Sequence, residues 1–506
     1  MEIGPILRLR LASTICFSVL AAVAQGQQPA TTSQDSGLTQ KQIQRRIFEG
    51  EQQMISSLIG TAPRLETYLQ SLSPQTKAER PIDDAYFLSK VDFSRGYEES
   101  GQGRRGYQTF FFGGPGPNRT VRVNNGRRWK LYPDGFLDML FVDLEDFDGE
   151  TYNLSYIKAE PFGGALCLTY FVTPKDVSAR GKFRGRIWVE SSTFKIIRIN
   201  GTFKPTPVGF WRRTVGGDIP IYFSFDSVRQ EVAPGTWMPW YSYLDEDRTW
   251  KQLNHNGETD FHYRGHIFIW GYRNTAERSG KPYLPSHLDD EKLLANPDIV
   301  ERGLNVIVNK IAVSNNLNLP DIECRVLLTT PVEIFHSGHT VIVSRGLLNL
   351  LPDDSVLPLL LAREISEMTL LGRANPDVRG PADVNAEEWS SAVALATKAG
   401  YSDGIFSTCW LFAQLAERSK QVPNLVQSRF GASLLLSSAP PLAGKILAQG
   451  RSGTTLTLRG KYTIDAWDAK LQIRPEGYND TQTAGASQLQ QFPRFTSHDV
   501  ATAPVD

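Results

Sequence analysis

The sequence predicts an α+β protein in which an antiparallel sheet comes first and a mainly helical domain follows. Across residues 121–272 apolar and polar residues alternate, as in 185–190, and Gly, Pro, Asn and Asp separate the alternating segments. From residue 299 onward the apolar residues recur instead with the spacing of amphipathic helices. The polar, proline-containing stretch 276–289 lies between the two patterns and is assigned to a linker.

Length and composition indicate a folded chain of two or three domains. It has 506 residues, of which 41% are hydrophobic and 21% charged, and this excludes a fibrous or wholly disordered protein. Lys and Arg together number 54, as do Asp and Glu, so the formal net charge is zero. A neutral chain has no general electrostatic attraction to nucleic acid, and we expect no nucleic-acid partner.

The first residues have the pattern of an export signal. Arg8 and Arg10 precede an apolar run at 11–24, which ends in the small-residue pattern Ala-Val-Ala. We therefore predict a signal peptide over 1–26 and a location in the periplasm or cell envelope. An uncleaved membrane anchor is the alternative, although the run is shorter than the ~20 residues that a spanning helix needs.

Export makes the cysteine count informative. Without Cys16, which lies in the apolar run, Cys167, Cys324 and Cys409 remain, widely spaced and with no CxxC pair. We interpret them as small buried apolar residues. At most one disulfide could form, and the sequence leaves open which two residues would form it.

The first elements are a helix and then strands. The segment 27–80 is predicted to be a polar linker and a helix over 38–59, which Gly60 and Pro63 end. The antiparallel β domain is assigned to 81–275.

The second half is assigned to a domain over 290–440, a β segment over 441–476 and a disordered tail over 477–506. Its helices are predicted from apolar spacing and its strands from short alternating runs. The predicted helices are 299–312, 355–371, 386–399 and 404–420, and the predicted strands are 324–329, 340–344 and the alternating part of 454–473.

The β domain carries a resemblance to a known family. The segments FRGRIWVESSTFKIIRINGTF at 183–203 and VAPGTWMPWYSYLD at 232–245 resemble LolA-like outer-membrane lipoprotein-sorting domains. This resemblance implies a curved antiparallel half-barrel whose hydrophobic cavity is covered by helices. Trp188, Phe223 and Trp237 are then candidates for cavity lining or core. The alternative is another antiparallel sheet without a lipid cavity.

A second resemblance covers roughly residues 290–420. TVIVSRGLLNLLPDDSVLPLLLAREISEM at 340–368 and NAEEWSSAVALATKAGY at 385–401 resemble the active-site region of HtpX-like zinc metallopeptidases, the family that includes the CAAX prenyl proteases. The resemblance implies a mainly helical, zincin-like domain with a metal-binding helix that carries HExxH.

The expected metal ligands are absent from that helix. Arg363 and Glu367 stand where the family has histidines, and only the central Glu364 is kept. Arginine has no acceptor atom and stays charged, so it cannot bind zinc. We expect no metal in the usual position, and instead an ion pair between Arg363 and Glu367, four residues apart on one helix face. The alternative is an ordinary helix with surface charges.

A rebuilt metal site is a further possibility. His336 and His339 precede the strand at 340–344, and with Glu364 or Glu367 they could supply nitrogen and oxygen ligands. The family's third ligand falls near Asn385, and the neighbouring Glu387 and Glu388 could take its place after a half-turn shift. If the site is active, Glu364 is the catalytic residue and zinc the cofactor.

These observations predict an exported cell-envelope protein with a degenerate, non-catalytic metallopeptidase-like domain and no cofactor. Its partner would be a lipid or lipoprotein, or an envelope protein or peptide. One alternative is an active zinc metalloendopeptidase with a rearranged metal site. The other is a structural envelope protein without a ligand.

Overall fold

The chain divides into two units, Met1–Ile43 and Gln44–Asp506. The predicted signal peptide, the linker at 276–289 and most of the tail lie outside the described residues. The computed structural model describes residues 37–72, 81–93, 98–103, 110–112, 121–122, 128–132, 135–162, 165–179, 181–203, 218–246, 262–272, 291–295, 299–317, 319, 322–351, 355–370, 386–401, 404–431, 434, 462–465, 470–473 and 490–491.

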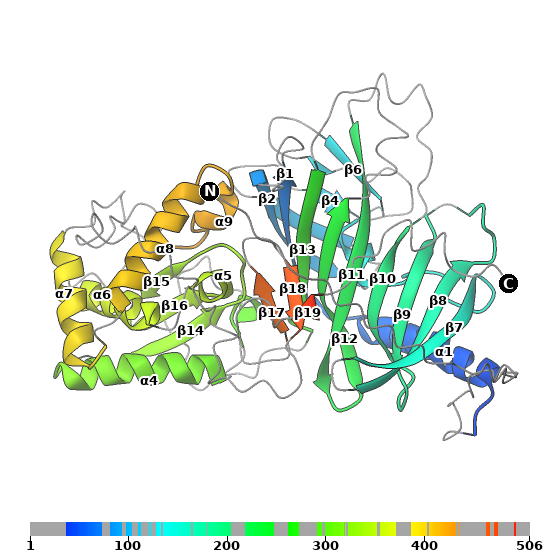
Figure 1. Cartoon of the computed structure of the whole chain (residues 1–506), viewed down its shortest axis with the longest axis horizontal. Coiled ribbons are helices and arrows are strands. Elements are labelled where there is room, and N and C mark those ends of the chain that lie inside the picture. The colour runs from blue at the N-terminus through cyan, green and yellow to red at the C-terminus, as the bar shows by residue number, and fades with distance from the viewer. Residues whose placement is uncertain are drawn as a thin grey trace, which may run out of the picture. The chain divides into compact units, whose positions relative to one another are not determined.

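A large sheet of thirteen strands dominates the second unit, in the order β4-β3-β2-β1-β13-β12-β11-β10-β9-β8-β7 (Figure 1). All neighbours in this order are antiparallel; β6 joins β11 in parallel, and β5 pairs with β6. The strands are β1 (Arg64–Leu72), β2 (Pro81–Asp92), β3 (Glu98–Gly103), β4 (Phe110–Phe112), β5 (Val121–Arg122), β6 (Arg128–Tyr132), β7 (Tyr152–Phe162), β8 (Ala165–Pro174), β9 (Phe183–Glu190), β10 (Ile196–Phe203), β11 (Asp218–Ala233), β12 (Thr236–Glu246) and β13 (His262–Trp270).

The predicted antiparallel sheet is confirmed, but it begins earlier than the sequence indicated. β1 falls in the segment 27–80 that was assigned to linker and helix, and it pairs with β13 along its whole length, from Arg64 opposite Trp270 to Leu72 opposite His262. At the far edge, the pairing of β7 with β8 shifts register between Tyr156 and Lys158.

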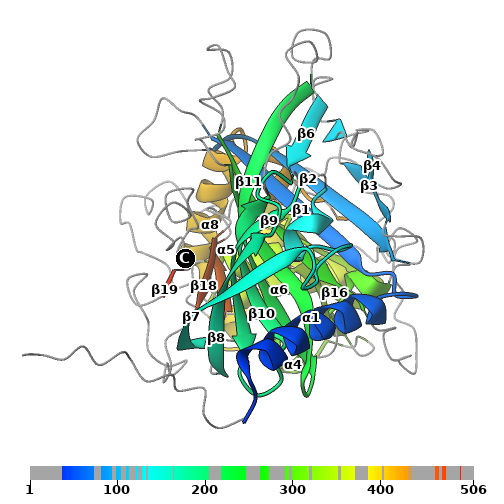
Figure 2. The same ribbon diagram turned by 90° about the vertical axis from the view of Figure 1, so that its right-hand side faces the viewer.

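One face of the sheet is covered by α1 (Gln40–Ser57) and by the short helix η2 (Leu137–Leu140). From Gln44 onward α1 runs along this face (Figure 2). There Glu51 forms a buried ion pair with Arg229 of β11 at 2.5 Å. The hydroxyls of Ser227 and Ser242 both donate to the carbonyl of Met139 in η2. Polar contacts from two adjacent strands thus fix the short helix on the sheet.

Aromatic side chains fill the core between this face and its covering elements. The rings of Phe183, Phe203 and Phe225 lie 5.6–5.9 Å apart. The ring of Phe183 lies over the paired Gly185 and Gly201, where an added Cβ would approach it to 2.6 Å. Glycine is required at both positions because an added Cβ would also approach the backbone oxygens of Asn200 and Arg184 to 2.3 and 2.5 Å.

The proposed cavity residues do not share one wall. Trp188 lies opposite Arg198, which in turn lies opposite Val228 of β11. Phe223 is five residues before Val228 on the same strand, so it points to the other face. Both aromatic side chains are buried, whereas Trp237 is only partly buried. Trp188 and Phe223 therefore belong to core on opposite faces, and one cavity cannot be lined by both.

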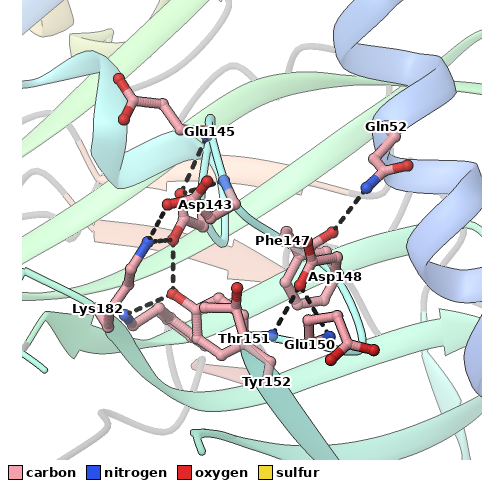
Figure 3. A network of polar contacts seen from close by, with 11 residues as sticks. Gln52, Asp143, Glu145, Phe147, Asp148, Glu150, Thr151, Tyr152 and Lys182 are labelled. Atoms are coloured by element: carbon pink, nitrogen blue, oxygen red, sulfur yellow. Dashed lines mark hydrogen bonds and ion pairs between the residues drawn. The ribbon is translucent and has the colours of Figure 1, made fainter. Parts of the chain in front are cut away.

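The loop between η2 and β7 is fixed by Asp143 (Figure 3). Its carboxylate accepts hydrogen bonds from the Tyr152 hydroxyl at 2.7 Å and from the Lys182 ammonium at 2.8 Å, and from the backbone amides of Glu145 and Asp146 at 3.0 Å. Because Tyr152 begins β7 and Lys182 directly precedes β9, this one carboxylate fixes the start of β7 relative to the start of β9.

The three described cysteines are free and buried, as the sequence indicated for small apolar residues. Burial raises the pKa of the Cys167 thiol to about 12 and also raises the pKa values of Cys324 and Cys409. All three are therefore held as neutral thiols in the folded chain.

The second half contains a three-stranded sheet, β14-β16-β15, in which β16 is parallel to β14 and antiparallel to β15. All four helices predicted for this half are present, and their ends agree with the prediction to within two residues. The elements are η4 (Glu291–Leu293), α4 (Ile299–Ser314), β14 (Glu323–Leu327), β15 (Ile334–Ser337), β16 (Thr340–Ser344), α5 (Arg345–Leu350), α6 (Val356–Leu370), α7 (Ala386–Lys398), α8 (Gly404–Arg418) and α9 (Pro423–Val426).

The segments after residue 440 contribute a small antiparallel sheet of β17 (Tyr462–Asp465), β18 (Lys470–Ile473) and β19 (Gln490–Gln491). The third strand lies in the segment 477–506 that is predicted to be a disordered tail, and the other residues of that segment lie outside the described residues. Among the described residues, no helix has both the length and the apolar composition needed to cross a membrane.

Glu66 connects the large sheet to the second half of the chain. This carboxylate is fully buried and accepts hydrogen bonds from the Tyr86 hydroxyl at 2.7 Å, the Thr330 amide at 2.6 Å and the Thr330 hydroxyl at 2.8 Å. Arg345 at the start of α5 donates to it at 2.6 Å and places its guanidinium 3.6 Å from the ring centroid of Phe268. The negative charge of Glu66, in the large sheet, is thus balanced by Arg345 of the second half of the chain.

Asp84 of β2 makes the second connection. Its two carboxylate oxygens accept from the backbone amides of Asn424 and Leu425, both at 2.8 Å, and so hold the N-terminal end of α9. Burial raises the pKa of Asp84 from 3.8 to about 6, and the hydrogen bonds from α9 only partly oppose this rise. Near neutral pH the carboxylate is therefore charged at a cost to stability.

We expect Asp84 to make the folded protein more stable in mild acid. A carboxyl group whose pKa is raised on folding stabilises the fold fully below pH 3.8, and this contribution is lost as pH rises through about 6. Between pH 4 and pH 7 the loss is about 2–3 kcal/mol. The free energy of unfolding from urea titrations should show this drop in the wild type and not in Asp84→Asn. An equal drop in both proteins would contradict the prediction.

Candidate functional site

The candidate site lies on α6, a helix that is buried on all sides. Leu359, Leu360, Leu361 and Ala362 follow one another along the chain and are each at most 2% exposed, and Ile365 is fully buried. On a helix without an exposed face, water cannot solvate the charged side chains. The charged residues of RExxE must therefore find partners inside the protein, and the interpretation as surface charges is wrong.

A histidine and two glutamates converge between α6 and β15. Nδ1 of His336, on β15, lies 2.9 Å from Oε2 of Glu364. His336, Glu364 and Glu367 each offer one ligand atom, and these three atoms lie within 4.8 Å of one another. These side chains are 2%, 0% and 9% exposed. Three groups that commonly bind metal ions thus meet in a buried place.

Arg363 lies beside this cluster. Its Nη1 is 3.7 Å from Oε1 of Glu364, and its guanidinium is 5.5 Å from the ring centroid of Trp389 in α7. The ion pair of Arg363 is therefore with Glu364, the next residue, and not with Glu367 as the sequence predicted. The two oxygens of Glu364 are divided, one toward Arg363 and one toward His336.

Two buried polar atoms of residues that are next to the cluster in sequence lack hydrogen bonds. Within the described part of the chain, neither the Ser366 hydroxyl nor Nε of Arg363 has a hydrogen-bond partner, although both atoms are buried. Ser366 lies between the two glutamates in sequence, but because it is two residues from Glu364 its side chain points to another face of α6. Buried polar groups are almost always satisfied by protein, water or an ion, so their lack of partners here needs an explanation.

The other predicted site residues are placed differently. His339 is exposed in the turn between β15 and β16, and it does not belong to the cluster of ligand atoms among the described residues. Glu388 is partly exposed near the start of α7 and is also outside that cluster. The side chain of Glu387 and residue Asn385 lie outside the described residues.

The sequence places His336 only before the predicted strand at 340–344, whereas in the structure it lies in a strand of its own. β15 is only four residues long and pairs with β16, with His336 opposite Val341. In the sequence, the short run Ile334–Ser337 directly before Gly338 indicates this strand. In the structure, Gly338 has a φ of 56°, as expected for the tight turn of a hairpin. The sequence thus indicates His336 as a possible ligand, but not the strand that directs its side chain toward α6.

The arrangement restricts the chemistry of Glu364. A general base must reach the water or substrate proton that it removes. Glu364 is fully buried, and its two oxygens face a histidine and an arginine. In this arrangement Glu364 is a structural acceptor or a ligand, because no described feature exposes it to a substrate.

No family model matches the chain, and no curated protein matches it. Solved structures match over slightly less than half of the chain. A LolA superfamily protein from Nitrosomonas europaea is 11% identical over 46% of this chain and 91% of its own, with a TM-score of 0.24. A putative outer-membrane lipoprotein-sorting protein domain from Vibrio parahaemolyticus is 10% identical over 44% and 91%, with a TM-score of 0.24.

A DUF1329 family protein from Desulfovibrio piger is 11% identical over 45% of this chain and 91% of its own, with a TM-score of 0.26. The chain thus has a low-identity likeness to LolA-like and DUF1329 structures. At TM-scores this low the likeness gives no information about the function of this chain.

We expect Arg363 and Glu364 to be energetically coupled. Arg363→Met removes the positive charge beside a buried carboxylate, so the free energy of unfolding should fall by about 3 kcal/mol, the lower end for a broken buried ion pair. Adding Glu364→Gln should cost much less than the sum of the single changes. Urea titration of the two single variants and the double variant measures this.

Arg302→Met is the matched control, because Arg302 is exposed on α4 and its loss should cost no more than about 0.5 kcal/mol. Additive effects of a few tenths of a kcal/mol at Arg363 and Glu364 would show that the two charges do not depend on each other.

Proposed function

We propose that the chain is a non-catalytic binding protein of the cell envelope, in which a degenerate metallopeptidase-like domain is joined to a large antiparallel sheet. The proposed ligand is apolar, a lipid or the acylated end of a lipoprotein, and an envelope protein is the other candidate. The export pattern at 1–26 supports the location. The resemblance of 340–368 to the metal-binding helix of the peptidases supports a metallopeptidase-like second domain.

The enclosure of Glu364 carries the non-catalytic part of this proposal. A peptidase of the zinc type needs a glutamate that can reach a metal-bound water, and a metal with one open position. Here the retained glutamate is fully buried between Arg363 and His336, and Arg363 puts a fixed positive charge where a metal ligand would stand. Neither an accessible glutamate nor a metal with an open position is therefore expected at Arg363 and Glu364.

Exposed apolar side chains on β7 and β8 support a binding role for the sheet. Tyr156 is 39% exposed, Ile157 43% and Leu166 57%. Tyr156 pairs with Tyr170, and Leu166 is four residues before Tyr170 on β8, so Tyr156 and Leu166 share a face. Exposed apolar groups on neighbouring strands can contact an acyl chain without opening the filled interior of the sheet.

The proposal predicts no peptidase activity. The purified mature protein, supplied with zinc, should release no more peptide from casein or from quenched fluorescent peptides than the buffer does, because Glu364 cannot act as a base. Glu364→Gln should give the same baseline, with Glu388→Gln as a control for a partly exposed glutamate. Hydrolysis that Glu364→Gln abolishes and Glu388→Gln preserves would favour the rearranged metalloendopeptidase instead.

The proposal also predicts that the β7–β8 surface binds apolar ligands. Leu166→Glu should weaken binding of a fluorescent fatty acid at least about tenfold, because it puts a charge on the apolar contact, and tenfold corresponds to about 1.4 kcal/mol. Fluorescence titration measures this. Val177→Glu is the control, since Val177 is 70% exposed in the turn after β8.

If the wild type binds no fatty acid, the lipid is excluded and an envelope protein remains. If Leu166→Glu and Val177→Glu behave alike, the β7–β8 surface is not the binding site.

A further inference from the structure

We propose that His336, Glu364 and Glu367 form a binding site for one divalent transition-metal ion, with zinc as the preferred ion, and that this ion is structural rather than catalytic. The inference goes beyond the proposed function, because a protein without peptidase activity can still hold a metal. It starts from the convergence of three ligand atoms within 4.8 Å of one another.

The ligand geometry fits a single ion. Zinc binds imidazole nitrogen at ~2.0–2.1 Å and carboxylate oxygen at ~2.0–2.2 Å, so ligands of one ion are necessarily a few ångströms apart. Glu364 and Glu367 are three residues apart on α6 and therefore neighbours on one helix face, and His336 faces them from β15. Two elements supply the ligands, so the site depends on the fold and not on one local motif.

The ligand types select the class of metal. One imidazole and two carboxylates suit zinc, manganese or iron, whereas calcium and magnesium prefer oxygen alone. With a neutral imidazole the three ligands carry a charge of −2, which one divalent ion neutralises. Among these metals the general affinity order favours zinc over manganese and iron.

Arg363 does not prevent this arrangement. The guanidinium approaches Oε1 of Glu364, whereas His336 approaches Oε2 of the same carboxylate. The charge of Arg363 therefore opposes an ion placed between residues 363 and 367, as in HExxH, but leaves the oxygen that faces β15 for an ion. The metal position proposed here is on the strand side of α6.

Burial assigns the ion a structural role. The three ligands are at most 9% exposed, so a substrate could not reach the fourth position that three protein ligands leave open on a tetrahedral zinc ion. An ion held by His336 and the two glutamates would tie β15 to α6.

The test uses the tag-free mature protein, stripped with a chelator and titrated with ZnCl2. We expect one zinc per chain by calorimetry and by elemental analysis after dialysis, and a rise in Tm that the chelator reverses. His336→Gln and Glu367→Gln should each weaken binding at least about tenfold. His339→Ala is the matched control, because His339 is exposed three residues away and should leave affinity unchanged.

A second readout does not depend on the stability of the variants. Cobalt bound to the wild type should give a visible absorption spectrum that Glu367→Gln alters and His339→Ala preserves. Circular dichroism confirms that each variant is folded. Less than 0.1 zinc per folded wild-type chain, or equal loss of affinity in His336→Gln and His339→Ala, would overturn the inference. Peptide hydrolysis tests the proposed function separately and does not bear on this outcome.

Discussion

The buried carboxylate of Glu66 is the constraint on which the arrangement of the two halves depends. It belongs to β1, in the middle of the large sheet, but its four hydrogen bonds come from Tyr86, Thr330 and Arg345. A carboxylate in such a place is tolerated only when every acceptor position is matched. The second half of the chain supplies most of that match, so the sheet and the helical part are each incomplete without the other.

The same principle acts along a row of side chains that crosses the sheet. The register places Trp188, Arg198, Val228, Tyr241, Phe268 and Glu66 opposite one another on successive strands. Arg198 is neutralised by Asp226 at 2.6 Å, and Arg345 stacks on Phe268. Aromatic rings lie between the charges and shield them from water, which strengthens each ion pair. On α6, Arg363 likewise lies near an aromatic ring, that of Trp389.

Much of the fold could be predicted from the sequence, because the helices and most strands are local patterns. α7 begins where its apolar spacing begins, at Ala386. β1 could not be predicted, since Glu66 and Gln70 look like solvent-facing residues until β13, almost two hundred positions later, buries them. In the site, the helix and Glu364 were predictable. The direction of His336 and the choice of Glu364 as the partner of Arg363 depend on packing between distant segments.

The register shift in β7 has a consequence for the behaviour of the protein at high concentration. β7 is the last strand in the order, with an edge that could add a strand from another molecule. The irregularity between Tyr156 and Lys158 interrupts its hydrogen-bonding groups, the exposed Lys158 adds a charge, and Pro161 has no amide to donate. Such features oppose edge-to-edge aggregation. A partner at this surface therefore meets side chains rather than backbone, and copies of the chain can crowd together without forming extended fibres through this edge.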